Sequence, residues 1–121
     1  MFNQKGFTLI ELVSVMIIMS VIASVSVKKL DIVSDSAESK AMEAAILELN
    51  ARESLIWTNM KLSNAGWTND GDLFGLIDTT LGQGFTWNGL PTTAGGTLEY
   101  RSQSILLVRD TSTSIKAARW H

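Results

Sequence analysis

The sequence has no cysteine among its 121 residues. A disulfide framework, thiol chemistry and a thiolate metal site are therefore excluded. The single histidine is the terminal His121, so the sequence offers no basis for a Ser-His-Asp set and little for a metal centre. The net charge is -2 and no basic block is present, which argues against a nucleic-acid-binding surface. The composition thus indicates no catalytic constellation, no metal and no cofactor.

Glycine and proline are also missing, but only from one long part of the chain. Neither occurs between Phe7 and Leu62. Because these two residues are the usual helix breakers, the stretch predicts a continuous helix of about 55 residues. Ser63-Asn64-Ala65-Gly66 follows, where Gly66 suits a left-handed cap that ends the helix.

The first part of this predicted helix is apolar enough to cross a membrane. Phe7 to Val27 comprises 21 residues with Glu11 as the only ionisable side chain, and a helix of this length spans roughly 30 Å. A secretory signal peptide fits poorly, because its apolar region should be shorter and end in small residues rather than in Lys28-Lys29. A plain transmembrane anchor leaves Glu11 unexplained, since a carboxylate in lipid costs free energy unless it is paired or neutralised.

A third interpretation accounts for the carboxylate. The block from Lys5 to Leu12, KGFTLIEL, resembles the leader and cleavage motif of type IV prepilins and the related pseudopilins. The resemblance covers about the first 27 residues closely. It implies that a prepilin peptidase cuts after Gly6 at the cytoplasmic face of the membrane, and that Phe7 becomes an N-methylated N-terminus. It also implies that Glu11 pairs with the N-terminal amine of a neighbouring subunit during assembly.

Such a pair has a physical logic. The amine of Phe7 and the carboxylate of Glu11 are each expensive in an apolar setting, and each lowers the cost of the other. The pair would therefore favour one axial register between adjacent helices. Glu11 lies four residues after Phe7, so a contact within one subunit is also geometrically possible.

Many members of that family have a proline and a glycine that are linked to local helix melting in filaments. Lys28 and Ser20 occupy the equivalent positions here. A helix that stays continuous through this region is therefore expected.

From Leu30 to about Leu62 the sequence becomes amphipathic. One apolar stripe has spacings of three and four, and we call it the alanine stripe: Leu30, Val33, Ala37, Ala41, Ala44, Leu47, Ala51 and Leu55. A second, the methionine stripe, is interrupted by Glu53 and contains Met42, Ile46, Leu49, Ile56 and Met60. Core packing against the C-terminal domain is favoured for the alanine stripe, whereas the methionine stripe could face other subunits.

The C-terminal part is rich in β-formers and turn residues. The segment TNDGDLFGLIDTTLGQG is expected to be a loop, GFTWNG a short strand ending at Asn88-Gly89, and LPTTAGG another loop. TLEYR and ILLVR read as two strands joined by Ser102-Gln103-Ser104, and TSIKAARW as a closing strand or a short helix. A small antiparallel sheet needs further apolar cover. We therefore predict an α+β, pilin-like fold in which the long helix packs on this sheet.

Two groups in the C-terminal part have alternative interpretations. Asp70 and Asp72 supply oxygen ligands of the kind Ca²⁺ prefers, but their spacing does not match a Ca²⁺ loop, and a solvated turn is favoured. The four tryptophans are expected in the core or at an interface rather than in a ligand cage. They are Trp57, Trp67, Trp87 and Trp120.

The leading hypothesis is a structural subunit rather than an enzyme. It divides the chain into a leader (1–6), a transmembrane and filament-core helix (7–29), an amphipathic helix (30–63) and a β-rich head (64–121). The precursor is expected in the bacterial inner membrane with its head outside the cytoplasm, and the product in an extracellular pilus or a periplasmic pseudopilus. Expected partners are prepilin peptidase, other pilin subunits, the inner-membrane assembly platform and membrane lipid, whereas nucleic acid is not expected. The alternatives are a type II secretion pseudopilin, with which the missing C-terminal disulfide loop agrees, and a membrane-anchored binding domain outside any filament.

Overall fold

The computed structural model describes residue 6 and residues 8–121. The chain divides into two compact units, Met1–Ala37 and Glu38–His121. The helix α1 (Leu9–Leu62) contributes to both units and is a single assigned α-helix of 54 residues. The continuous helix expected from the missing glycine and proline is therefore present. Gly66 adopts φ +68° just beyond its end, as a left-handed cap requires.

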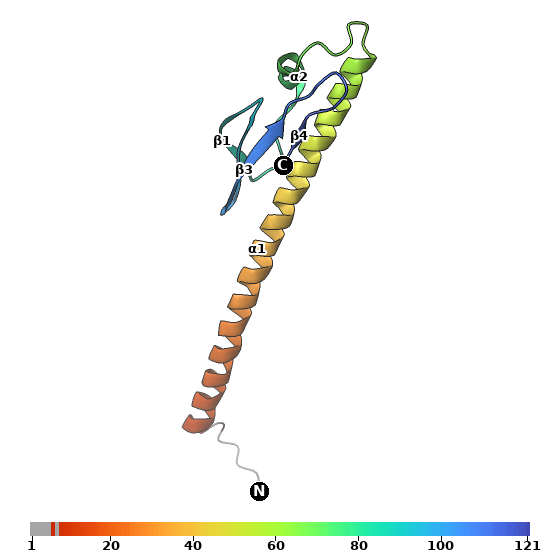
Figure 1. Cartoon of the computed structure of the whole chain (residues 1–121). Coiled ribbons are helices and arrows are strands. Elements are labelled where there is room, and N and C mark those ends of the chain that lie inside the picture. The colour runs from red at the N-terminus through yellow and green to blue at the C-terminus, as the bar shows by residue number, and fades with distance from the viewer. Residues whose placement is uncertain (1–5, 7) are drawn as a thin grey trace. The chain divides into compact units, whose positions relative to one another are not determined.

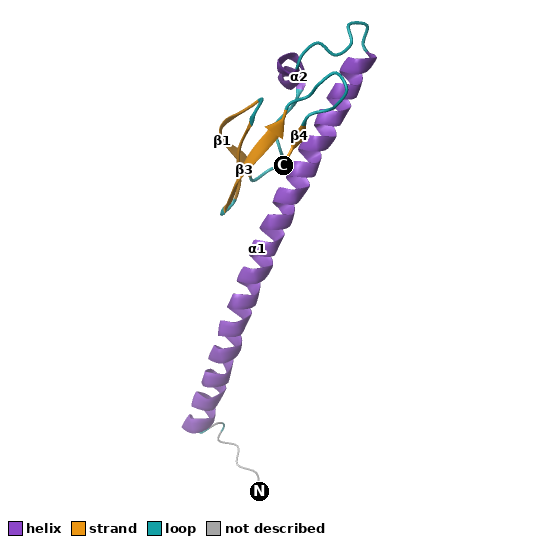
Figure 2. Cartoon of the chain, viewed as in Figure 1, coloured by secondary structure: helices purple, strands orange, loops and turns teal. Residues whose placement is uncertain are grey.

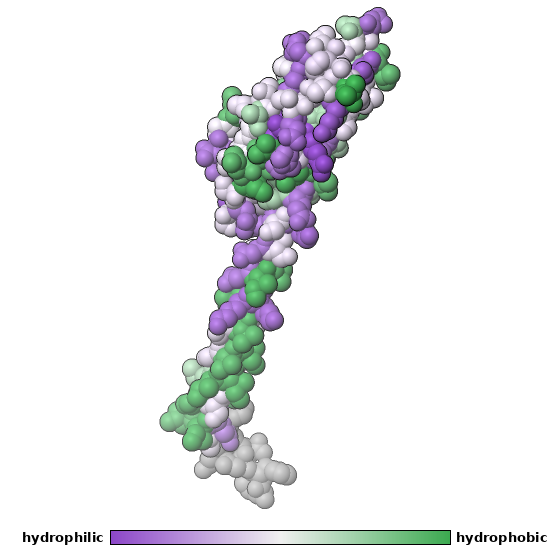
Figure 3. Space-filling model, in the orientation of Figure 1, coloured by the Kyte–Doolittle hydropathy of each residue, from purple (hydrophilic) through white to green (hydrophobic). Residues whose placement is uncertain are grey.

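The first unit consists of the N-terminal part of α1 and the residues before it. Every residue of this unit that the structure describes is exposed. Figure 3 shows a largely hydrophobic surface over the lower part of this segment, with hydrophilic residues toward its C-terminal end. One helix in the described part of the chain, α1, is long and apolar enough to cross a membrane by length and composition.

The second unit, which we call the head, combines the remainder of α1 with a four-stranded sheet. The strands are β1 (Phe85–Thr92), β2 (Gly95–Tyr100), β3 (Gln103–Asp110) and β4 (Arg119–Trp120). They lie in the order β1-β2-β3-β4, and each neighbouring pair is antiparallel. In Figures 1 and 2 the C-terminal half of α1 runs alongside these strands. This arrangement confirms the predicted α+β, pilin-like fold.

The core of the head lies between α1 and one face of the sheet. From α1 it takes Met42, Ala45 and Leu49, and from the strands Leu98, Leu107 and Trp120. Full burial of a leucine side chain contributes about 1.5–3 kcal/mol, and Leu49 and Leu98 are both completely buried. These contacts supply the apolar cover that a small sheet needs.

The core packing expected of the alanine stripe is provided by the methionine stripe instead. Met42 and Leu49 of the methionine stripe are buried against the sheet, whereas Leu47 and Leu55 of the alanine stripe are 69% and 60% exposed. Glu53, which interrupts the methionine stripe, is also completely buried. The reason is that Glu53 has a buried cationic partner on β3, so a carboxylate can occupy a core position. Hydrophobicity alone pointed to the wrong face.

The segment expected to be a loop after Trp67 contains the short helix α2 (Asp70–Leu76). Asn69 is its N-cap, and its Oδ1 accepts a hydrogen bond from Asp72 N–H at 2.8 Å. Asn69 and Asp70, which suggested a turn in the sequence, therefore form the start of a helix. A turn and a helix N-cap use the same bond from an Asn or Asp side chain to a nearby backbone N–H, so the sequence did not distinguish them.

The hairpin turns also differ from the expected ones. β1 continues through Asn88-Gly89 with an irregularity in its pairing, and the chain turns at Thr93-Ala94, inside the expected loop LPTTAGG. The next turn is at Arg101-Ser102, where Arg101 has φ +53°. The closing strand was the correct alternative for the last segment. β4 has only two residues and is held by Asn50 of α1, which bonds both the N–H and the C=O of Trp120, at 2.6 and 3.1 Å.

Candidate functional site

The start of α1 is formed by the residues of the predicted processing motif. Gly6 is exposed and adopts φ +80°, a conformation that glycine tolerates far better than other residues. The helix begins at Leu9, and the first turn closes with a bond from Leu12 N–H to Thr8 C=O of 3.1 Å. Gly6 therefore precedes the helix. Lys5 and Phe7 lie outside the described residues.

Thr8 and Glu11 bond one another reciprocally. The Thr8 N–H donates to Glu11 Oε2 at 3.1 Å, and the Glu11 N–H donates to Thr8 Oγ1 at 3.2 Å. This is a capping box, in which two backbone donors at the start of a helix are satisfied by side chains. This capping box was not predicted from the sequence, although the spacing Thr-x-x-Glu before an apolar run is its known signal. Glu11 therefore already has an intramolecular role in the uncut chain.

The capping box also orients the carboxylate. Glu11 points back toward the N-terminus of its own helix, the positive end of the helix dipole, where a negative charge is stabilised. Its neighbours are apolar and exposed: Leu9 is 79% and Ile10 75% exposed. The motif thus places one charge, aimed at the preceding residues, on an otherwise apolar surface.

The serines of this segment are compatible with an apolar surrounding. Ser14, Ser20 and Ser26 each donate their hydroxyl to the backbone carbonyl four residues earlier, at 2.8, 2.8 and 2.9 Å. Since these hydroxyls are satisfied within the helix, they do not need water.

A comparison with protein families identifies this region. Residues 1–27 match the model of the prokaryotic N-terminal methylation motif. The chain carries the type IV pilin and pseudopilin signature. No curated protein and no solved structure matches the chain.

This signature bears on the nature of the chain. It supports a pilin-like or pseudopilin-like precursor, and the motif belongs to a structural family rather than to an enzyme family. A motif of this kind implies processing by prepilin peptidase and assembly with other pilin subunits. Together with the long apolar helix, it is consistent with a membrane-anchored precursor.

The pilin-like head has a buried ionic cluster that the sequence did not reveal. Arg109 on β3 donates a bidentate pair of hydrogen bonds to the Glu53 carboxylate of α1, at 2.7 and 3.1 Å. It donates a second pair to the Asp70 carboxylate of α2, at 2.7 and 3.0 Å. The side chains of Arg109 and Glu53 are fully buried, and that of Asp70 is 14% exposed. Burial raises the pKa of Asp70, but hydrogen bonds from Arg109 and Ser112 and the charge of Arg109 outweigh it, so the pKa lies below its usual 3.8. The cluster connects three elements of the head.

This cluster bears on the possible Ca²⁺ site. Both carboxylate oxygens of Asp70 accept hydrogen bonds from Arg109, so the guanidinium already occupies the position where these oxygens would bind a Ca²⁺ ion. The Asp72 carboxylate accepts bonds from Thr68 and Asn69, at 3.1 and 2.9 Å. Over the described residues, no group of three or more His, Cys, Asp or Glu side chains is placed to hold a metal ion. The two aspartates therefore contribute to the helix start and the ionic cluster.

The four tryptophans use their indole N–H groups within the head. Trp120 is completely buried and donates to Glu53 Oε1 at 2.9 Å. The other three donate to loop residues at 2.8 to 3.2 Å: Trp57 to Thr113, Trp67 to Ser112 and Trp87 to Thr79. Trp120 is in the core and Trp87 packs against it, whereas Trp57 and Trp67 bond the segment from Ser112 to Thr113, so the four do not form a cage. His121 is exposed, with Nε2 3.2 Å from Asp110 Oδ1.

Proposed function

We propose that this chain is the precursor of a structural filament subunit. It is cleaved after Gly6, N-methylated at Phe7 and assembled into a type IV pilus-like filament through its N-terminal hydrophobic helix. The observation that carries the proposal is the placement of Glu11, a single carboxylate in the first turn of an apolar helix and bonded to Thr8 N–H. An uncharged glutamine could cap the helix of a plain membrane anchor equally well, so the negative charge itself favours a chain that acquires a cationic partner.

Cleavage would change the surroundings of Glu11. The amine of Phe7 would be a cationic donor one residue before Thr8, on the side toward which the carboxylate points. A charged pair in an apolar environment is stabilised when both partners are present and strongly penalised when one is missing. Glu11 would therefore favour the cut chain, either within its own subunit or in contact with a neighbour.

The exposed apolar surface of α1 supports the same sequence of events. Before assembly this surface would be covered by membrane lipid with the head outside the cytoplasm. Afterwards it would be covered by the helices of other subunits in an extracellular pilus or a periplasmic pseudopilus. The membrane segment (7–29) and the leader (1–6) follow from this proposal, as does contact with an inner-membrane assembly platform.

Processing is tested by mass spectrometry of the protein from cells with an active prepilin peptidase. The expected product lacks residues 1–6 and carries a methyl group on Phe7. Gly6→Val is expected to prevent cleavage, because the new side chain strains a backbone of φ +80° and alters the residue before the cut bond. An intact N-terminus in the unaltered protein would refute the proposal.

Assembly is tested by shearing filaments from cells and comparing two substitutions of one residue. Glu11→Val removes both the charge and the cap, whereas Glu11→Gln keeps an acceptor for Thr8 N–H and removes only the charge. Both variants are expected to enter the membrane and to lose filament yield. The control is Glu43→Val, the same chemical change at an exposed position of α1 in the head. Normal filament yield from Glu11→Gln would show that Glu11 acts only as a cap and would exclude the charge pair.

A further inference from the structure

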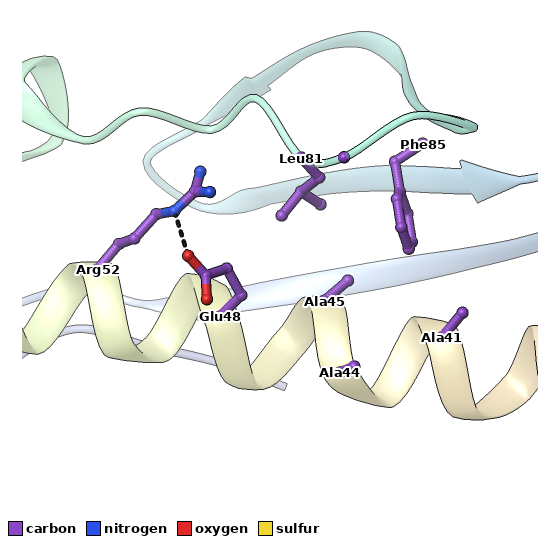
Figure 4. Close-up of a pocket in the computed structure, with 8 residues that line it drawn as sticks. Ala41, Ala44, Ala45, Glu48, Arg52, Leu81 and Phe85 are labelled. Carbon is purple, nitrogen blue, oxygen red and sulfur yellow. Dashed lines mark hydrogen bonds and ion pairs between the residues drawn. The ribbon is translucent and has the colours of Figure 1, made fainter.

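The head has an open apolar groove between α1 and the segment that precedes β1. We call it the α1 groove, and its volume is about 380 Å³. It is lined by Ala41, Ala44, Ala45, Glu48, Arg52, Leu81, Gly82 and Phe85. Figure 4 shows Leu81 and Phe85 projecting toward α1, where the alanines leave space because their side chains are a single methyl group. The α1 groove could therefore accept one more apolar side chain.

The polar end of the α1 groove has an excess of negative charge. Glu48 Oε1 lies 2.9 Å from Arg52 Nε, and the same guanidinium donates to the carbonyls of Asp78 and Thr80, each at 2.7 Å. Asp78 adds a second carboxylate beside Arg52. Asp78 is a carboxylate at neutral pH, and a hydrogen bond from Thr80 N–H, at 2.9 Å, lowers its pKa below the usual 3.8. Two carboxylates thus accompany one guanidinium.

A second feature of the head complements this groove. The turn Thr113–Lys116 closes with bonds of 2.8 and 3.4 Å between its end residues, and Ile115 at its tip is 88% exposed. The turn is tied to α1 by Trp57, which donates to Thr113 C=O, and by Lys61, which donates to Ser114 C=O at 2.7 Å. Because the turn is already anchored, its backbone would lose little conformational entropy when Ile115 binds a partner.

The charge beside Ile115 is positive. Lys116 follows it directly, and Lys61 Nζ lies against the preceding residue. Neither lysine has an ion-pair partner within the described part of the chain. An isoleucine accompanied by two ammonium groups without a carboxylate partner among the described residues matches an apolar groove that ends in surplus carboxylate.

The two features lie on opposite sides of α1. Residues nine apart in an α-helix point in opposite directions, because nine residues make about two and a half turns. Glu48 and Arg52 of the groove are nine residues before Trp57 and Lys61, which hold the turn. The turn therefore cannot reach the groove of its own molecule. A contact between unlike surfaces of identical subunits is heterologous, and such a contact builds an open helical array when its rotation does not close into a ring.

We propose that Ile115 of one subunit inserts into the α1 groove of a second copy. Lys61 and Lys116 of the first subunit then face Glu48 and Asp78 of the second. This inference rests on the proposed function. One buried isoleucine does not offset the cost of associating two free proteins, so the contact forms where the N-terminal helices already hold the subunits at high effective concentration. It is expected in filaments and not between isolated chains.

Cysteine crosslinking tests this contact in the full-length protein, because the chain has no cysteine of its own. Ser114→Cys lies beside Ile115, and Gly82→Cys lies in the groove, where an added Cβ meets nothing within 4 Å. The control pairs Gly82→Cys with Leu90→Cys, an apolar residue that is 92% exposed elsewhere on the head. Sheared filaments are treated with a short bismaleimide and separated under denaturing conditions.

The expected result is a ladder of covalent multimers from Ser114→Cys with Gly82→Cys, and no ladder from either single variant or from the Leu90→Cys pair. Adding Lys116→Glu should remove the ladder, and adding Glu48→Lys as well should restore it. Filaments that form normally without a Ser114–Gly82 ladder would overturn this contact and leave the proposed function intact. Failure of the cysteine-free parent to form filaments in cells with an active assembly system would instead overturn the proposed function.

Discussion

Arg109 is the residue whose replacement tests the physics of the head most directly. Arg109→Met keeps much of the side-chain volume and removes the guanidinium that faces Glu53 and Asp70. Glu53 would then keep one hydrogen bond, from Trp120 Nε1 at 2.9 Å, in a position that is completely buried. The contact of the guanidinium with the face of Phe74, 4.9 Å from the ring centroid, would also be lost.

The size of the effect follows from burial. Removing one partner of a buried ion pair costs about 3–5 kcal/mol, because the other charge stays desolvated without compensation. A small domain has a free energy of unfolding of about 5–15 kcal/mol. The substitution should therefore remove about a fifth or more of the stability of the head, although methionine packs well in apolar surroundings.

Urea unfolding of the full-length protein in detergent micelles measures this loss. Tryptophan fluorescence is a suitable signal because Trp120 is completely buried beside the cluster. With an m-value of about 2 kcal/mol/M, the midpoint should fall by roughly 2 M. The control is Arg119→Met, the same change at an exposed position of the neighbouring strand β4, with an expected effect of about 0.5 kcal/mol or less. Equal midpoints for the two variants would refute the reasoning that the cluster is structurally important.

Two further predictions concern the same unit. The pKa of Asp70 is lowered in the folded state, so Asp70 adds stability above its ordinary pKa of 3.8 and loses that contribution as the pH falls through the folded value. The urea midpoints of the unaltered protein and of Asp70→Asn should therefore converge as the pH is lowered below 3.8, and a constant difference would contradict the prediction. Gly95→Ala should destabilise the head by about 1–3 kcal/mol, because Gly95 has φ +130° and an added Cβ would collide with the carbonyl oxygen of Leu107. Gly82→Ala, where the added Cβ meets nothing within 4 Å, should have little effect, and equal losses in both variants would exclude the collision as the cause.

The sequence allowed the N-terminal motif and the long helix to be predicted because both depend on local patterns. Gly6, Phe7 and Glu11 belong to one short block, and the helix follows from the composition of a stretch without glycine or proline. The capping box is equally local and could have been predicted from the sequence, since Thr8 and Glu11 have the required spacing. The start of α2 at Asn69 was missed because an Asx turn and an N-cap use the same residue types.

The buried face of α1 could not be predicted in this way. Both stripes have helical spacing, and the alanine stripe was the less interrupted one. Glu53 made the methionine stripe less attractive as a core face, yet it is buried because Arg109, 56 positions later, lies opposite it. Short-range patterns contain no information about such a partner.

By itself, the sequence determined that this protein begins its helix with a pilin-type processing motif and continues as an apolar, membrane-length segment. Neighbouring residues are sufficient for that, because a helix and its cap are stabilised by bonds between residues three and four apart. Only the tertiary structure decided which face of α1 packs on the sheet, where Arg109 finds its two carboxylates, and that the α1 groove and Ile115 lie on opposite sides of the helix. Those features depend on residues far apart in the chain, which are brought together only when the sheet packs on the helix.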